Sequence, residues 1–116
     1  MKTVLFMVRT APHGSAAIPE SHRACLGFAT MPFEVCYLLT EEAVWALQPG
    51  QHAEAIGGQD ARALVSELGD LGVSLYAEAE ALQARGIDSA EVAPVQPLSA
   101  DEIADLIASA DAVMTY

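Results

Sequence analysis

Residues 2–8 read KTVLFMV, and residues 33–39 read FEVCYLL. Both are short, nearly continuous apolar runs, rich in β-branched and aromatic residues, which is typical of strands buried on both faces of a parallel sheet. The first run ends at the turn sequence APHG (residues 11–14), and the second follows a break at Met31-Pro32. These two stretches therefore predict two buried strands, each bounded by turn-forming residues.

The rest of the chain alternates between helical and strand patterns. Further strands are predicted at residues 73–77 and 111–116, and residues 91–95 are predicted to form a strand or an extended connection. Helices are predicted at 18–30, 40–47 with Thr40 as N-cap, 60–71 and 78–85. A last helix is predicted to begin at a capping box at Ser99, with Ile103, Leu106 and Ile107 facing inward. The longest predicted loop spans residues 48–59, and loops of this length are usually functional or interfacial.

This alternation predicts a single domain over residues 1–116, of the three-layer α/β class, with a mostly parallel five-stranded sheet and helices on both faces. Ligands and partners of such folds meet the carboxyl ends of the strands. The sequence therefore directs the search for a site to residues 10–15, 40–42 and 77–79.

The charge of the chain narrows the class of partner. Sixteen acidic and five basic residues give a net charge of −11, which disfavours direct binding to nucleic acid or to a membrane surface. The apolar run at residues 4–8 is too short for a membrane span. The sequence also shows no signal-peptide pattern, that is, no apolar segment followed by a cleavage site of small residues. We therefore expect a cytoplasmic protein.

The two cysteines, Cys25 and Cys36, are expected to be reduced in that compartment. Both lie in apolar patterns, where cysteine behaves as a small hydrophobic residue, and neither has a CxxC neighbour. A reactive cysteine needs a lowered pKa and access to solvent. We expect Cys36 to be inert in a strand, and keep Cys25 as an alternative nucleophile because its helix could have an exposed side.

Histidine and glycine spacings predict neither a metal site nor a cofactor. His13, His22 and His52 do not combine with the cysteines in a metal-ligand spacing, and the glycines form no nucleotide-binding motif. His13 lies in the turn after the first strand, where its imidazole could orient a thiol or persulfide. The alternative interpretation is that His13 caps the following helix or packs against a neighbouring subunit. Glu78 lies at a predicted helix start, where the helix dipole favours a carboxylate.

Four segments in order carry a resemblance to a known family: APHGS (residues 11–15), LQPGQ (47–51), LQARG (82–86) and SADAV (109–113). With them the chain resembles the DsrE/DsrF family, most closely its DsrF and TusC branch. The resemblance implies a compact α/β subunit that assembles with a DsrE/TusD-like and a DsrH/TusB-like subunit, often as a hetero-hexamer. Such complexes pass persulfide sulfur between carriers, toward tRNA thiolation or in sulfur oxidation.

The same resemblance implies a role for one position. In the sulfur-carrying relatives, of the DsrE and TusD type, a cysteine stands eight residues before the glycine of Leu-x-x-Arg-Gly, and Glu78 stands eight residues before Gly86. A carboxylate cannot hold persulfide sulfur. We therefore expect a non-catalytic subunit with His13 and Glu78 at an inter-subunit edge. The alternatives are a sulfur carrier that uses Cys25, and a homo-oligomeric module that binds a small ligand at the strand ends.

Overall fold

The computed structural model describes residues 1–48 and 60–116. Five strands form one sheet in the order β4-β3-β2-β1-β5, and each neighbouring pair is parallel. The strands are β1 (Lys2–Val8), β2 (Phe33–Leu39), β3 (Ser74–Glu78), β4 (Gln96–Leu98) and β5 (Ala112–Thr115). The predicted α/β fold with a five-stranded parallel sheet is confirmed.

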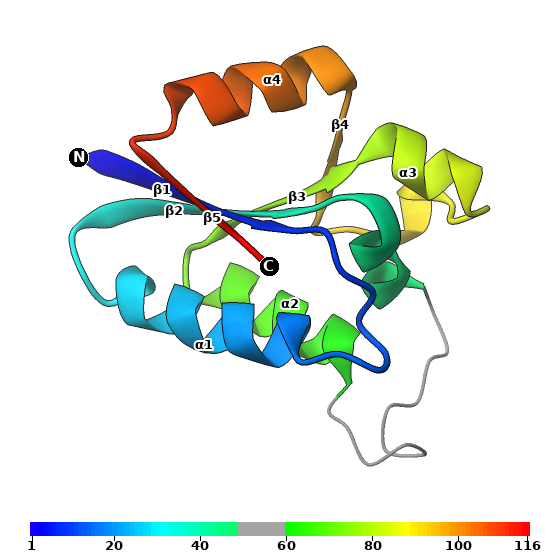
Figure 1. Ribbon diagram of the computed structural model, residues 1–116, viewed down its shortest axis with the longest axis horizontal. Helices are drawn as coiled ribbons and strands as arrows, with labels where there is room; N and C mark the ends of the chain where they lie inside the picture. The colour runs from blue at the N-terminus through cyan, green and yellow to red at the C-terminus, as the bar shows by residue number, and fades with distance from the viewer. Residues whose placement is uncertain (49–59) are drawn as a thin grey trace.

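Helices cover both faces of this sheet. They are α1 (Ala17–Ala29), the 3-10 helix η1 (Glu41–Leu47), α2 (Ala61–Asp70), α3 (Ala79–Ala84), the short 3-10 helix η3 (Ser89–Glu91) and α4 (Ala100–Ser109). In Figure 1, α1 and α2 lie on one face and α4 lies on the other. Asp60 caps α2, and Ser99 and Glu102 form the predicted capping box of α4.

Side-chain alternation along β1 divides the interior into two cores. Val4, Phe6 and Val8 pack with α1 and α2 in the larger core, whereas Leu5 points to the opposite face and joins Ile103 of α4 in a smaller one. Because β1 and β2 lie inside the sheet and are covered on both faces, both orientations of their side chains are apolar. This burial explains the continuous apolar runs in the sequence.

Local predictions for these elements differ from the structure in several places. Residues 91–95, predicted as a strand or an extended connection, form no strand and instead connect η3, which ends at Glu91, to β4, which begins at Gln96 and contains Pro97. An edge strand tolerates proline because only one of its sides is paired. The predicted helix at 78–85 begins one residue later, so Glu78 is the last residue of β3. Ile107, expected to face inward, is 38% exposed.

A clamp formed by Arg62 fixes η1 beside α2. Its Nη1 donates a hydrogen bond to the carbonyl oxygen of Leu47 (2.5 Å), and its Nη2 donates to that of Glu91 (2.6 Å). One guanidinium thus joins the end of η1, the first turn of α2 and the end of η3.

The loop predicted at residues 48–59 lies outside the described residues except for Gln48, and so does His52. Within the described ranges, no helix has the length and apolar character needed to cross a membrane.

Candidate functional site

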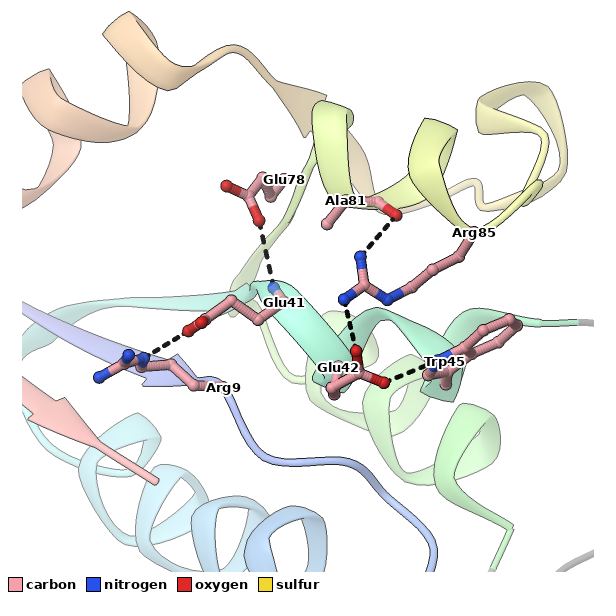
Figure 2. Close-up of polar contacts among 7 residues, drawn as sticks. All are labelled: Arg9, Glu41, Glu42, Trp45, Glu78, Ala81 and Arg85. Atoms are coloured by element: carbon pink, nitrogen blue, oxygen red, sulfur yellow. Dashed lines mark hydrogen bonds and ion pairs between the residues drawn. The ribbon is translucent and has the colours of Figure 1, made fainter.

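The carboxyl ends of β1, β2 and β3 bring three side chains together, as Figure 2 shows: Arg9, Glu41 and Glu78. Arg9 follows β1, Glu41 begins η1 just after β2, and Glu78 ends β3. Glu41 and Glu78 lie within the search area predicted from the strand ends, whereas Arg9 lies one residue outside it.

A shallow pocket of about 390 Å³ adjoins this cluster. It is lined by Arg9, Thr10, Glu41, Thr115 and Tyr116, so it lies at the ends of β1 and β5. In open α/β sheets, ligands bind outside the carboxyl ends of the strands, and this pocket lies at that edge of the sheet.

The carboxylate of Glu78 caps η1 from the neighbouring strand. Its Oε1 accepts a hydrogen bond from the backbone N–H of Glu41 at 3.1 Å. The predicted N-cap residue, Thr40, makes no such bond; its hydroxyl donates to the carbonyl oxygen of Val8 at 3.4 Å. The expected capping by Thr40 was therefore wrong, and a side chain from another strand satisfies the first N–H of η1 instead.

The backbone at Glu41 is strained. Its φ of 51° lies in the left-handed region, which costs a non-glycine residue about 1–2 kcal/mol. This conformation turns the chain from β2 into η1 and points the N–H of Glu41 at Glu78. Strained backbone of this kind clusters at functional sites, where the surrounding contacts hold it in place.

An ion pair holds the side chain of Glu41 on the other side. Arg9 Nε lies 2.5 Å from Glu41 Oε2, and both side chains are more than half exposed, at 57% and 51%. The hydrogen bond from Arg9 lowers the pKa of Glu41, and the same bond raises the pKa of Arg9. An exposed pair adds little stability. Its effect is to orient Glu41 and to neutralise its charge.

A second ion pair joins η1 to α3. Arg85 Nη2 lies 2.6 Å from Glu42 Oε1, and Arg85 Nη1 donates to the carbonyl oxygen of Ala81 at 3.1 Å. Trp45 Nε1 donates to Glu42 Oε2 at 3.0 Å. The hydrogen bond from Arg85 is the main cause that lowers the pKa of Glu42. Glu41 and Glu42 thus each have an arginine partner, whereas Glu78 accepts from a backbone N–H.

The other residues singled out from the sequence lie elsewhere. His13 is exposed in the turn between β1 and α1, and it is not among the residues that line the strand-end pocket. Cys25 is fully buried, and burial, with a smaller contribution from Cys36, raises its pKa to about 12. Cys36 is also buried, and burial followed by the charge of Glu34 raises the pKa of its thiol. These environments disfavour the reactive thiolate of either cysteine.

Sequence reasoning found Glu78 but missed its partners. The paired register Val8↔Leu39 brings the residues after β1 and β2 side by side, and this register is what lets Arg9 reach Glu41. A charged residue within two positions of the end of each of the first three predicted strands, Arg9, Glu41 and Glu78, was the available signal. Among the described residues, no group of three or more His, Cys, Asp or Glu side chains is placed to hold a metal ion.

Comparisons with known proteins agree on one family and one fold. The model of the DsrE/DsrF-like family matches residues 2–116. The chain is 29% identical over 119 residues to Protein TusC of Escherichia coli (strain K12) and to Protein TusC of Shigella sonnei, with full coverage of each chain. The crystal structure of the ychN protein from E. coli superposes with a TM-score of 0.86 at 24% identity, covering 100% of both chains. The structure of a protein of unknown function, MTH1491 from Methanobacterium thermoautotrophicum, superposes with a TM-score of 0.72 at 16% identity, also over the full length of both chains.

Proposed function

Since this chain belongs to the DsrE/DsrF-like family, we propose that it is a non-catalytic subunit of a sulfur-relay complex, in which a partner subunit carries the persulfide sulfur. Its full-length similarity to proteins named TusC supports a TusC-like place in such a complex. In this proposal residues 1–116 form a single domain, and the complex is cytoplasmic. The sulfur serves tRNA thiolation in this proposal, with sulfur oxidation as the alternative pathway.

The observation that carries the proposal is the place of Glu78. The resemblance to the family implies a cysteine at the corresponding position of the carrier subunits, and here a carboxylate accepts the N–H of Glu41 at the ends of the strands. A persulfide forms when a thiolate attacks the outer sulfur of a donor R–S–SH and releases R–S⁻, and a carboxylate forms no stable bond of this kind. Glu78 therefore acts as a structural cap at the edge where carrier subunits bind sulfur.

The rival role as a sulfur carrier depends on Cys25, whose burial argues against it. We expect Cys25 of the native chain to react with iodoacetamide at pH 8 roughly a thousandfold more slowly than in the denatured chain, because a thiol with a pKa of about 12 is almost wholly protonated there. Cys36 is also expected to react more slowly in the native chain, because burial raises the pKa of its thiol. Alkylation rate against pH, read by intact mass, measures this. Fast labelling of native Cys25 near neutral pH would support the carrier role instead.

Complex formation tests the proposal directly. The purified chain is mixed with a DsrE/TusD-like subunit, a DsrH/TusB-like subunit and a persulfide donor. We expect one stable hetero-oligomer in which the added sulfur is found on the DsrE/TusD-like subunit and not on this chain. Light scattering gives the assembly and intact mass gives the sulfur. Stable stoichiometric sulfur on this chain would refute the non-catalytic role, and failure to assemble would refute the subunit role.

A second candidate function is favoured by the pocket at the ends of β1 and β5. A polar pocket of about 390 Å³ at the carboxyl ends of two parallel strands is a suitable place for a small ligand. In this case the chain forms a homo-oligomer and binds neither the DsrE/TusD-like nor the DsrH/TusB-like subunit. The sizing measurement above separates the two candidates, because a homotrimer or homohexamer that is unchanged by those subunits favours the second.

A further inference from the structure

A groove runs between α4 and the edge of the sheet formed by β3 and β4. It has a volume of about 430 Å³, an apolar floor of Tyr76, Leu98 and Leu106, and a rim that includes the carboxylates of Glu102 and Asp105. We call it the α4 groove. The α4 groove forms because only a narrow stripe of α4 side chains packs against the sheet. Ile103 is the buried residue of this helix, and Leu106 and Tyr76 stay half-buried.

The lining of the α4 groove includes apolar surface that solvent still reaches. Tyr76 and Leu106 are only half-buried there, and carboxylates border them. Partly exposed apolar side chains with polar residues around them are typical of a surface that a protein partner covers.

The charge of this region decides between a second copy and a different partner. From Gly86 to Tyr116 the sequence contains no Lys, Arg or His, and its acidic residues are Asp88, Glu91, Asp101, Glu102, Asp105 and Asp111. A second copy that brought the same face to the α4 groove would place carboxylates against carboxylates, and opposed like charges are unfavourable at an interface. The complementary partner is basic.

We propose that the α4 groove docks a segment of a sister subunit that carries a Lys or Arg beside an apolar side chain. The aliphatic stem of the basic residue lies on Tyr76, Leu98 and Leu106, and its cation meets Glu102 and Asp105. This inference rests on the proposed function, since the partner is the DsrE/TusD-like or the DsrH/TusB-like subunit. It adds a site on a surface other than the strand-end cluster and states its chemistry.

Two variants of α4 test the groove. Asp105→Lys reverses a charge on the rim, and Ser109→Arg puts a bulky cation into the lining near the carboxyl end of the helix, where the helix dipole favours it. We expect each to weaken binding to the sister subunit by about tenfold or more. The affinity of the unmodified chain is expected to fall as salt is raised from low to physiological concentration, and that of Asp105→Lys to fall less.

Asp101→Lys is the matched control. Asp101 is exposed on the same helix and the substitution makes the same change in charge, but the residue does not line the α4 groove. We expect it to change the affinity by less than about fivefold. Thermal unfolding of each variant alone verifies that it is folded. Calorimetric titration with each sister subunit supplies the dissociation constants.

The outcomes separate this inference from the function beneath it. If the three-subunit complex forms but Asp105→Lys and Ser109→Arg bind as tightly as the unmodified chain, the docking role of the α4 groove is refuted and the subunit role stands. The same holds if Asp101→Lys weakens binding as much as Asp105→Lys. If the unmodified chain binds neither sister subunit, the proposed function fails and the groove assignment fails with it.

Discussion

Replacing Glu78 by cysteine is expected to turn this chain into a carrier of persulfide sulfur. The substitution places a thiol at the end of β3, where the N–H of Glu41 now donates to the carboxylate. In the variant this N–H is available to the thiolate and then to the persulfide anion, which lowers the pKa of the new thiol. Arg9 neutralises Glu41, which reduces the repulsion that a nearby carboxylate would exert on a thiolate.

The measurement is intact mass after incubation with a persulfide donor and removal of the donor. We expect stoichiometric gain of one sulfur atom on Glu78→Cys and none on the unmodified chain, whose cysteines are both buried. Glu80→Cys is the control, because Glu80 is exposed in the first turn of α3, two residues away. Equal sulfur on both variants would mean that exposure alone is sufficient, and no sulfur on Glu78→Cys would remove position 78 from the relay.

The largest loss of stability is expected from Phe6→Ala. Phe6 is fully buried in β1, in edge contact with Phe28 at 5.7 Å between ring centroids and stacked on Tyr116 at 6.3 Å. Truncating it removes the transfer free energy of the ring and leaves a cavity, which costs about 3–5 kcal/mol. That is a large part of the 5–15 kcal/mol typical of a domain, so the midpoint of urea unfolding should fall steeply.

Phe33→Ala serves as the comparison. Phe33 also makes an edge contact with Phe28, at 5.4 Å, but it is only half-buried at the start of β2. The same truncation there should cost clearly less, because solvent already reaches the ring and can fill the space. Equal losses at the two positions would mean that the Phe28 contact, rather than burial in the central strand, determines the cost.

The buried strands and the capped helices could be predicted from the sequence. β1 and β2 match the apolar runs because covering both faces requires both orientations of side chain to be apolar, and turn residues bound each run. Ser99 caps its helix as the local pattern predicted, and Asp60, the first residue of the helix predicted at 60–71, is the N-cap of α2. β4 was misplaced because a three-residue strand that contains Pro97 has almost no strand pattern, and its position depends on β3.

The candidate site was only partly visible in the sequence, for a related reason. Resemblance to the DsrE/DsrF family pointed to Glu78, but the residue that it contacts is 37 positions away, and the positive φ of Glu41 leaves no mark in a non-glycine sequence. Thr40 was the expected cap because local reasoning considers only neighbouring residues. Contacts between parallel strands depend on their register, and that becomes known only in the folded chain.

The short β4 strand also bears on how the chain avoids uncontrolled polymerisation. An open sheet edge can recruit strands from other molecules and start fibrils. β4 forms one edge with three residues, and because one is Pro97 it has at most two N–H donors to offer an incoming strand. Concentrated solutions of the chain should therefore resist growth through the β4 edge.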